Sequence, residues 1–276
     1  MHLAVIPLIF ESDQIWLGSY IFEKGDTKMT ELYAHGRSLP EAYHDALKHL
    51  YNWSTIVDDA SHNTRCKECS MTMVVREPLA EPMISRCVPC GPAELEQYRM
   101  EMLDGIMDFC VGRGWDYTYH ERIAPQIPRI IQMLKQDGTT RQAFIDVRRP
   151  DDIYRTDPPC LTSVFYMIRD GKLDCSVLFR SNDAVKATFM NAFALICLQK
   201  RIADKLGVGV GTYTHRANSF HAYERDWPLL SSYVDRIYAE KDLTYRYVGD
   251  WDEQMKEAEP EIFRKVDELK WRNLKI

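Results

Sequence analysis

The sequence predicts a single α+β domain over residues 1–276, in which a mostly antiparallel or mixed β-sheet packs against one long buried helix and several peripheral helices. Three observations lead to this prediction. Short apolar runs separated by turn residues recur through the first two thirds of the chain, as strands do. Residues 191–206 open with NAFALICL, which is apolar on almost every side and therefore predicts a buried helix. Residues 228–276 are charged and amphipathic, which is typical of helices on the outside of a domain.

The first half of the chain is predicted to contain strands and three helices. Residues 1–23 hold two apolar runs, LAVIPLIF and IWLGSYIF, and residues 71–75 hold a third, so all three predict strands. The polar segment 57–65 predicts a loop, and so does the tyrosine-rich segment 115–122. Apolar residues recur at helical spacing in three segments, which are 40–51, 94–109 and 127–135.

The second half of the chain centres on a β-hairpin. Asp170-Gly171 is a two-residue turn signal, and the apolar runs on either side of it predict the two strands. Residues 148–159 are rich in Pro and Asp and predict a loop before the hairpin, whereas 142–147 and 212–223 predict further strands. The chain shows no repeat and no linker, which favours one domain.

Composition limits the classes of function. The chain has 276 residues, of which 45% are hydrophobic and 28% are charged, as in ordinary globular proteins. Its net charge of −6 argues against a nucleic-acid polymer or an anionic membrane as the main partner. Eight cysteines without a signal peptide predict a reducing compartment and hence a cytoplasmic protein, and no segment is apolar over the length of a membrane span.

Cys160 is the first candidate for catalysis. It follows the dipeptide Pro-Pro, which restricts the backbone just before the thiol. A thiolate is a strong nucleophile near neutral pH, and a neighbouring cation lowers the pKa of the thiol. The alternative is a buried structural cysteine, which is what we expect of Cys110, Cys175 and Cys197.

Arg180, Ser181 and Asp183 lie where the second strand of the hairpin ends. A guanidinium beside a hydroxyl suits a phosphate, because several donors converge on one anion. The same guanidinium would favour a thiolate nearby, and Asp183 would supply a carboxylate. The alternative is an exposed strand end capped by polar residues.

Asn191 begins the apolar helical segment and is the candidate for base recognition. A primary amide donates through its nitrogen and accepts through its oxygen, which matches O4 and N3–H of uracil. Cytosine presents the reverse pattern and would favour a carboxylate at this position. The alternative is that Asn191 serves as a helix N-cap.

His221 and Tyr223 alternate on a predicted strand, so their side chains should face the same side of a sheet. They could bind a sugar hydroxyl there. The alternative is a half-buried structural pair.

Half of the cysteines form two C-x-x-C pairs. The members are Cys66, Cys69, Cys87 and Cys90. Their C-x2-C-x17-C-x2-C spacing is typical of a structural zinc site, with residues 66–90 as a zinc-knuckle hairpin. Four sulfur ligands leave no open coordination position, so a catalytic zinc is not expected. The alternative is four reduced, partly buried thiols.

The candidate residues together resemble the thymidylate synthase family. Cys160 after Pro-Pro, the RSND run at 180–183, Asn191 and the S-x-H-x-Y run at 219–223 follow the order and spacing of that family, across roughly a third of the chain. The run YTYHER at 117–122 is similar to the archaeal and phage-type branch, which includes pyrimidine nucleotide hydroxymethylases.

Two features depart from the family pattern. Leu161 stands where the bacterial enzymes have His after the nucleophile. The usual Gly and Pro between Asp183 and Asn191 are also absent.

The resemblance implies a role for each candidate. Cys160 would attack C6 of a pyrimidine nucleotide, and Asp183 would bind the pterin ring of the cofactor. Tyr119 would assist removal of the C5 proton, and Asn191 would recognise the pyrimidine. The nucleotide's phosphate and ribose would be bound by a larger set, namely Arg180, Ser181 and Arg65 for the phosphate and His221 with Tyr223 for the ribose.

The resemblance implies two further residue roles, one at a dimer interface and one in catalysis. Arg141, which lies 19 residues before Cys160, matches an arginine that family members donate across an obligate homodimer interface. The family's catalytic glutamate, which organises water near the base, has three candidates: Glu96, Glu101 and Glu121.

The implied reaction is C5 methylation of dUMP to dTMP, with 5,10-methylene-tetrahydrofolate or a methanopterin analogue as carbon donor and reductant. One alternative is a 5-hydroxymethylase of dUMP, dCMP or CMP, in which water traps the exocyclic methylene. Two features favour this alternative, namely the altered segment between Asp183 and Asn191 and the presence of His120 in YTYHER. Another alternative is a catalytically degenerate nucleotide- or zinc-binding protein on the same fold. The predicted substrate is a pyrimidine nucleoside monophosphate.

Overall fold

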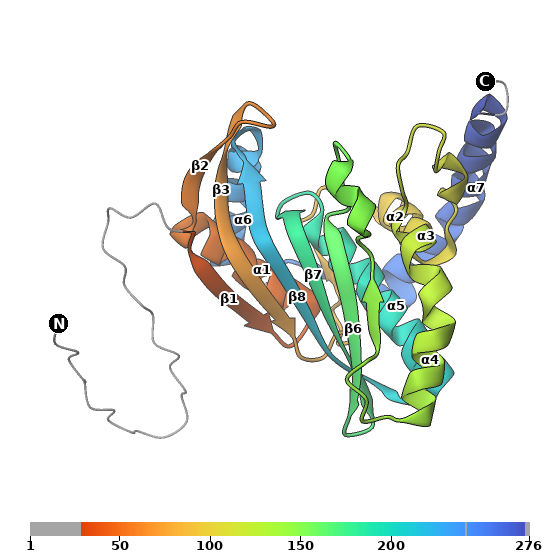
Figure 1. The fold of residues 1–276 in the computed structure, drawn as a ribbon. Coiled ribbons are helices and arrows are strands. Elements are labelled where there is room, and N and C mark those ends of the chain that lie inside the picture. Colours follow the sequence, from red (N-terminus) through yellow and green to blue (C-terminus); the bar gives the residue numbers. More distant parts are fainter. Residues whose placement is uncertain (1–28, 241, 274–276) are drawn as a thin grey trace, which may run out of the picture.

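A seven-stranded mixed sheet forms the centre of the molecule (Figure 1), in a computed structural model that describes residues 29–240 and 242–273. The strand order is β1-β3-β8-β7-β6-β5, and β2 pairs with the first half of β3. Two of the six pairings are parallel, β1 with β3 and β7 with β8, and the other four are antiparallel. The strands are β1 (Glu31–Gly36), β2 (Thr55–Asp59), β3 (Thr64–Val75), β5 (Phe144–Asp146), β6 (Leu161–Arg169), β7 (Lys172–Asp183) and β8 (Gly209–Tyr223).

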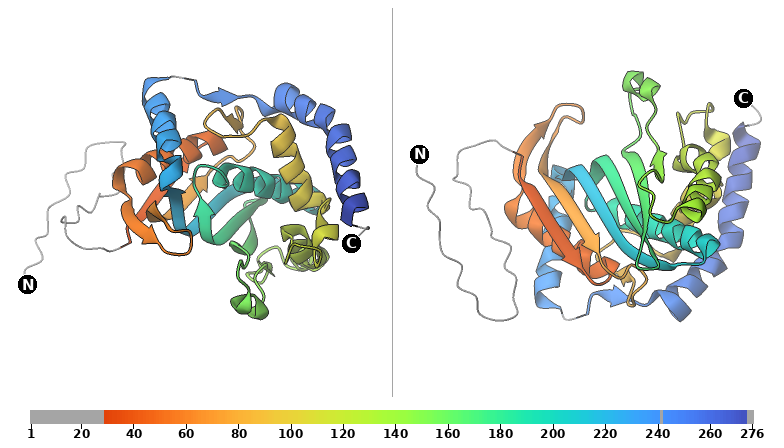
Figure 2. Two further views of the ribbon diagram at one scale, coloured as in Figure 1. Left: turned by 90° about the horizontal axis from the view of Figure 1, so that it is seen from above. Right: turned by 60° about the horizontal axis from the view of Figure 1, so that its bottom comes forward.

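Within the described residues, the helices cover one face of this sheet and leave the other face, called the open face below, without a covering helix (Figure 2). Helices α1, α5 and α6 pack on the covered face, and α2 lies between α5 and α7. A small second sheet pairs β4 (Ile84–Ser85) with β9 (Thr244–Tyr245). The helices are α1 (Leu39–Trp53), α2 (Pro92–Asp104), α3 (Tyr119–Ile123), α4 (Ile127–Gln136), α5 (Thr188–Leu206), α6 (Trp227–Ala239) and α7 (Asp252–Asn273).

Helix α5 is the long buried helix that the sequence predicts. Residues such as Phe193 and Leu195 are completely buried, because the first turns of the helix are apolar on almost every side. The helix ends at Gly207, which adopts a left-handed conformation with φ of 72° that glycine adopts without strain. The predicted α+β architecture with a mixed sheet is therefore confirmed. None of the described helices combines the length and the hydropathy needed to cross a membrane.

The predicted hairpin is also confirmed. Strands β6 and β7 pair antiparallel, with Arg169 opposite Lys172. Asp170 and Gly171 both have positive φ, 48° and 72°, as a type I′ turn requires. This local geometry matches the twist of the strands, which explains why the sequence signal was reliable.

The predicted loop at 57–65 is wrong, because this segment forms the tip of a β2–β3 hairpin. The Asp59 carboxylate accepts hydrogen bonds from the backbone amides of Ser61 and His62 and closes the turn. Strand β3 then begins at Thr64, before the apolar run at 71–75. The tip is polar because it is exposed, and this polarity concealed the strands on either side.

Several other boundaries differ from the predictions. The helix predicted at 94–109 ends at Asp104, because Gly105 takes a left-handed conformation with φ of 65°. The segment predicted as a loop at 115–122 contains the start of α3, and β1 was not predicted. The strands predicted within residues 1–23 lie outside the described residues.

Candidate functional site

Most of the predicted site residues lie together at one end of the central strands, which is the top of the sheet in Figure 1. This row of strand ends is called the upper edge of the sheet below. On β8, His221 pairs with Asp183 of β7 on one side and with Glu68 of β3 on the other. The backbone amide of Arg180 donates to the carbonyl oxygen of Cys160 at 2.8 Å. The ends of β7 and β8 and the start of β6 therefore meet at this edge, and Cys160, Asp183 and His221 share it.

Cys160 is half-buried and lies immediately before β6. The guanidinium of Arg180 donates from Nη2 to the carbonyl oxygen of Pro158 at 2.7 Å and from Nε to that of Pro159 at 3.1 Å. Burial raises the pKa of the Cys160 thiol above its usual value, the positive charge of Arg180 opposes this shift, and Asp157 adds to it. The cysteine is therefore a neutral thiol near pH 7, held in place through its own backbone.

The segment before Cys160 is anchored by a buried ion pair. Arg122 of α3 donates from Nη2 to an oxygen of Asp152 at 2.9 Å, and both side chains are almost fully buried. Asp152 lies in the short 3₁₀ helix Pro150–Tyr154 of the loop that leads to Cys160. Removing one partner of such a pair leaves an uncompensated buried charge, so the pair restricts this loop to one position.

Three tyrosines surround the thiol and Asn191. The hydroxyl oxygen of Tyr119 accepts from the backbone amide of Leu161 at 3.2 Å, and the ring of Tyr117 lies 5.7 Å from that of Tyr119. The hydroxyl of Tyr98, on α2, donates to Oδ1 of Asn191. Burial raises the pKa of all three phenols, that of Tyr117 to about 12, so all three are neutral hydrogen-bond donors near pH 7.

Asn191 lies within α5 and is not its N-cap. The helix begins at Thr188, and the backbone amide of Asn191 donates to the carbonyl oxygen of Ala187 at 2.9 Å. The alternative interpretation of Asn191 as a cap is therefore wrong. Its side chain is 5% exposed, and a buried amide needs hydrogen-bond partners, one of which is Tyr98.

Asp183 ends β7 and supports the turn into α5. Its Oδ1 accepts from the backbone amides of Val185 and Lys186, at 2.9 Å each. Its Oδ2 has no hydrogen-bond partner in the part of the chain that the structure describes, so it is available to a ligand. Ser181 is half-buried two residues earlier on the same strand, opposite Ser219.

His221 and Tyr223 face the same side, as the sequence predicts. Their rings are 4.8 Å apart with an interplanar angle of 74°. Nδ1 of His221 lies 3.3 Å from the hydroxyl of Ser219. Nε2 of His221 has no hydrogen-bond partner within the described residues.

Arg65 lies near the same edge but has a protein partner. It forms an ion pair with Glu224, with 3.2 Å between Nε and Oε2, and its guanidinium lies 5.4 Å from the centre of the Trp227 ring. A phosphate at Arg65 would therefore compete with the carboxylate of Glu224.

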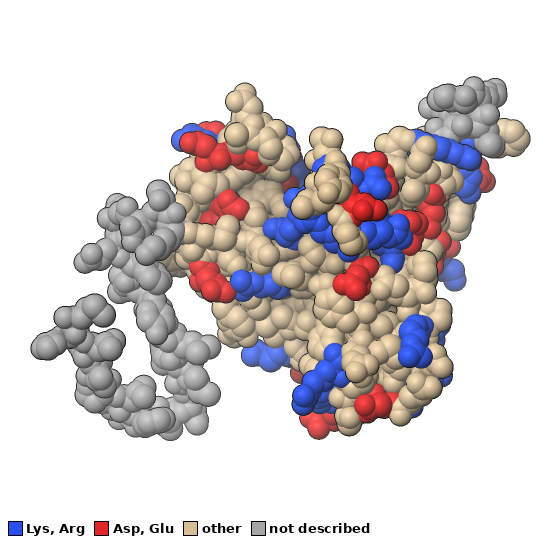
Figure 3. All heavy atoms as spheres, viewed as in Figure 1, with Lys and Arg blue, Asp and Glu red and all other residues tan. Residues whose placement is uncertain are grey.

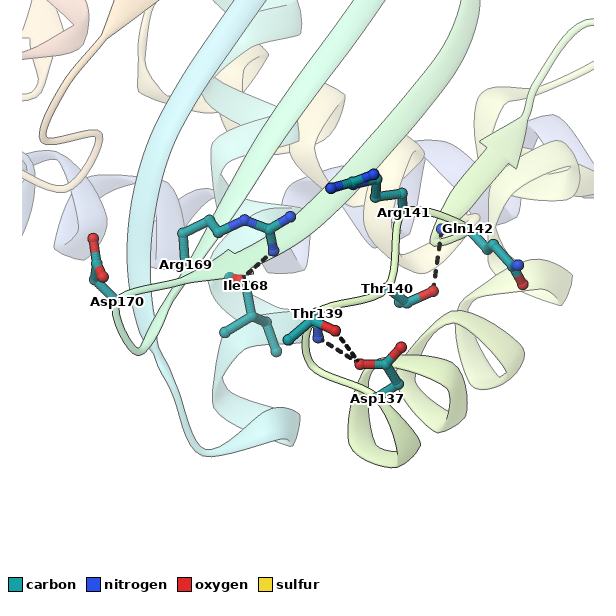
Figure 4. Close-up of a pocket in the computed structure, with 8 residues that line it drawn as sticks. All are labelled: Asp137, Thr139, Thr140, Arg141, Gln142, Ile168, Arg169 and Asp170. Atoms are coloured by element: carbon teal, nitrogen blue, oxygen red, sulfur yellow. Dashed lines mark hydrogen bonds between the residues drawn. The ribbon is translucent and has the colours of Figure 1, made fainter.

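Arg141 lies at the opposite end of the sheet from Cys160. It lines an open hollow of about 680 Å³ together with Arg169, the last residue of β6 (Figure 4). Since β6 has nine residues, this hollow is about 30 Å from Cys160. Arg141 forms no ion pair with any carboxylate of residues 29–240 and 242–273, and Figure 4 shows its guanidinium pointing toward that of Arg169. A single chain does not bring Arg141 to the site.

None of the three candidate glutamates contacts Cys160 or Asn191 through a hydrogen bond within the described residues. Glu96 is buried and pairs with Arg99, while Glu121 pairs with Arg149. Glu101 accepts from Gln97 at 2.9 Å, and burial raises its pKa. Its negative charge also contributes to the raised pKa of the Tyr98 phenol.

The predicted zinc site is wrong. The described residues, which include all four cysteines, contain no group of three or more His, Cys, Asp or Glu side chains that could hold a metal. Cys66 and Cys69 lie on β3, which pairs with β1, β2 and β8, whereas Cys87 and Cys90 follow β4, which pairs with β9. The zinc-knuckle hairpin that the spacing predicts at 66–90 is therefore not formed. None of the four forms a disulfide, and burial raises the pKa of these thiols, to about 11 for Cys66 and Cys90, so they are protonated near pH 7.

Sequence patterns missed Tyr98 and Tyr117. Tyr98 lies in the segment 94–109, which the sequence predicts only as an amphipathic helix, and the sequence holds no signal that the Tyr98 hydroxyl reaches a residue 93 positions away. Tyr117 belongs to the tyrosine-rich run, where the resemblance drew attention to Tyr119 alone.

Comparisons with known proteins agree with this arrangement. The family model described as thymidylate synthase matches residues 22–264. A protein of Methanocaldococcus jannaschii named "Putative thymidylate synthase" is 32% identical over 216 residues, which cover 71% of this chain and 93% of that protein. A protein of Methanosarcina barkeri with the same name is 28% identical over 210 residues, 73% of this chain and 94% of that protein.

A solved structure shares the fold. Thermostable thymidylate synthase A from Bacillus subtilis superposes with a TM-score of 0.58 at 17% sequence identity, over 72% of this chain and 84% of that chain. Its sequence is too distant to carry residue roles, and it supports the architecture alone. The family model and the archaeal relative together establish that the chain belongs to the thymidylate synthase family of one-carbon transferases.

Proposed function

We propose that this protein methylates C5 of dUMP to give dTMP, with Cys160 as the nucleophile and a methylene-tetrahydrofolate-type cofactor as the carbon donor. The observation that carries the proposal is the position of Cys160. Its half-buried thiol lies at the same sheet edge as Asp183 and His221, close to the phenol that is bonded to the amide of Asn191. A nucleophile, a base-recognising amide and a ribose-binding pair are then within reach of one nucleotide.

The thiol of Cys160 has to lose its proton before it attacks. Desolvation opposes this loss, whereas the positive charge of Arg180 favours the thiolate. In the proposed reaction the sulfur bonds to C6 of the base, the C5=C6 electron pair moves to C5, and C5 bonds to the transferred carbon. Both bonds between that carbon and the nitrogens of its donor would break during the transfer, and the electron pairs would stay on the nitrogens. The C5 proton leaves, aided by Tyr119, and the sulfur departs again from C6. The bound cofactor supplies the one-carbon unit and the hydride that completes the methyl group.

Recognition of the nucleotide is assigned to residues around the same edge. Arg180 uses Nε and Nη2 for the peptide carbonyls, so Nη1 remains for the 5′-phosphate beside Ser181. Arg65 would join them by exchanging Glu224 for the phosphate. His221 and Tyr223 are proposed to bind the ribose.

Asp183 fits the role of a pterin ligand. Its Oδ1 is held by two backbone amides, which fixes the carboxylate in one orientation. Its Oδ2 remains available to accept from the N–H groups of a pterin ring.

The open face of the sheet supports a homodimer in which Arg141 serves the neighbouring chain. Figure 3 shows few charged side chains over the middle of this face. Leu178 lies between Ser163 and Arg216 there, and Phe165 packs against Phe144, which is 45% exposed. A face of half-buried apolar and small polar residues suits burial against a second copy. Since Arg141 lies far from its own Cys160, only a second chain would bring it near a thiol.

His120, one of the two features that favour the hydroxymethylase, has a protein partner, because its Nδ1 bonds to the carboxylate of Asp108 at 2.7 Å. We retain methylation as the proposed reaction, with the hydroxymethylase as the alternative that the product analysis tests.

The test is incubation of the protein with dUMP and methylene-tetrahydrofolate, with the nucleotide product identified by mass spectrometry. Methylation predicts dTMP together with dihydrofolate, which its absorbance reveals. A hydroxymethylated nucleotide with release of tetrahydrofolate would contradict methylation. Cys160→Ala should abolish turnover while dUMP still binds, and turnover near that of the wild type would remove Cys160 as the nucleophile.

A further inference from the structure

We propose that Tyr98 determines which pyrimidine the site accepts, because its hydroxyl holds the side-chain amide of Asn191 in one orientation. Tyr98 acts here as a positioning residue and not as a catalytic one. The inference rests on the proposed function, since it concerns how the same site distinguishes uracil from cytosine.

The contact joins two helices that pack against each other. Tyr98 projects from α2, and its hydroxyl donates to Oδ1 of Asn191 on α5. The backbone amide of Asn191 bonds within α5, so the contact with Tyr98 is the hydrogen bond that orients the side chain among the described residues. The carbonyl end of the amide therefore faces α2.

The phenol of Tyr98 is a donor that needs an acceptor. Burial and the charge of Glu101 raise its pKa, so the phenol keeps its proton near neutral pH. Within the described residues, Oδ1 of Asn191 is the acceptor of that proton. If the amide turned over, Nδ2 would face the phenol and the phenol proton would lose its acceptor, and a buried unsatisfied donor is unfavourable.

The orientation of the amide selects the base. Uracil presents O4 as acceptor and N3–H as donor, so it needs Nδ2 opposite O4 and Oδ1 opposite N3–H. Cytosine presents the reverse pattern and needs the amide turned over. Oδ1 has two lone pairs, so it can accept from Tyr98 and from N3–H of uracil together. Tyr98 therefore disfavours cytosine at a distance, without touching the base.

The experiment compares the Kd values of dUMP and dCMP, by calorimetry, for the wild type and for Tyr98→Phe. The variant loses one oxygen atom and keeps the ring. We expect the preference for dUMP over dCMP to fall about three- to tenfold, as the loss of one orienting hydrogen bond predicts. An unchanged ratio in the folded variant would overturn the inference. Tyr51→Phe is the matched control, because its hydroxyl lies 3.4 Å from that of Ser231 between α1 and α6, and it should leave the ratio unchanged.

A second comparison separates orientation from a general structural effect. In an Asn191→Asp background the two carboxylate oxygens are equivalent, so Tyr98→Phe should not change the nucleotide ratio there. A ratio that changes equally in both backgrounds would show that Tyr98 acts through packing, against the inference.

A third measurement uses the wild type and needs no nucleotide. The Nδ2 protons of Asn191, identified by NMR through their loss in Asn191→Asp, should show no strong contact with the ring protons of Tyr98. A strong contact would mean that the amide is turned over and would overturn the inference. If the wild type bound neither nucleotide, the proposed function would fail, and the NMR result would still report the amide orientation separately.

Discussion

The backbone amide of Arg180 is bonded to the carbonyl oxygen of Cys160, and the guanidinium of the same arginine binds the two peptide carbonyls that precede this cysteine. The guanidinium of Arg180 therefore holds the backbone before the thiol and also supplies a positive charge that lowers the pKa of the thiol. Both effects come from this one side chain, so one substitution tests them together.

Arg180→Gln should make Cys160 less reactive. Without the guanidinium, the charge that opposes the raised pKa of the thiol is lost, so less thiolate forms at a given pH. The rate of alkylation by iodoacetamide at pH 7 should fall, and the midpoint of its pH profile should move to higher pH. Arg264→Gln, on the exposed face of α7, is the control and should not change the rate. A midpoint that stays in place would exclude Arg180 as the group that acts on the thiol.

Asn191→Asp should shift base preference from dUMP toward dCMP. A carboxylate accepts from the amino group of cytosine but cannot donate to O4 of uracil. The ratio of the two affinities should change about tenfold, as one exchanged hydrogen bond to a charged group predicts. Competition binding measures this ratio, with Asn52→Asp on α1 as the control, because that side chain bonds to Tyr238. Equal preference in variant and wild type would mean that Asn191 does not contact the base.

Arg141 should act on the neighbouring chain. Arg141→Ala and Cys160→Ala should each be inactive alone, since every site of either homodimer lacks one of the two residues. After the two are mixed and allowed to exchange chains, half of the dimers are mixed and each holds one complete site, so about a quarter of the wild-type activity should return. No recovery, although mass spectrometry detects mixed dimers, would place Arg141 outside the neighbouring site.

His215 should make stability depend on pH. It is fully buried between β7 and β3, stacks 4.6 Å from Phe179, and bonds through Nε2 to Oδ1 of Asn182 at 2.8 Å. Burial lowers its pKa to about 3, below the ordinary value of 6.5. As the pH falls below 6.5, His215 of the unfolded chain binds a proton, whereas the buried His215 of the folded chain stays neutral. The free energy of unfolding therefore decreases with falling pH, down to about pH 3, where the folded chain also binds the proton.

The measurement is urea unfolding of the wild type and His215→Gln between pH 7.5 and 4.5. The variant should be less stable by about 1–3 kcal/mol at neutral pH, because a buried hydrogen bond is lost. The difference in free energy of unfolding between the wild type and the variant should become smaller as the pH falls, because only the wild type loses stability through His215. His35→Gln, at an exposed position on β1, is the control. A constant deficit across this range would mean that His215 does not titrate on unfolding.

Local sequence signals predicted the parts of the fold that depend on local geometry. Asp170-Gly171 placed the hairpin, because a two-residue turn needs residues that tolerate positive φ. The apolar run after Asn191 placed the buried helix, although its start was three residues late. The polar tip of the β2–β3 hairpin was missed, because exposure hides a strand from an analysis based on apolar patterns.

The sequence by itself determined the chemical groups of the site and their order along the chain, from Cys160 through Asp183 to His221. The tertiary structure alone decided which of these groups meet. It separated the two cysteine pairs, placed Arg141 at the far end of β6, and joined Tyr98 to Asn191 across 93 residues. The physical reason is that spacing along a chain reports neighbours within one helix or strand, whereas contacts between elements depend on how the sheet orders its strands and how the helices pack on it.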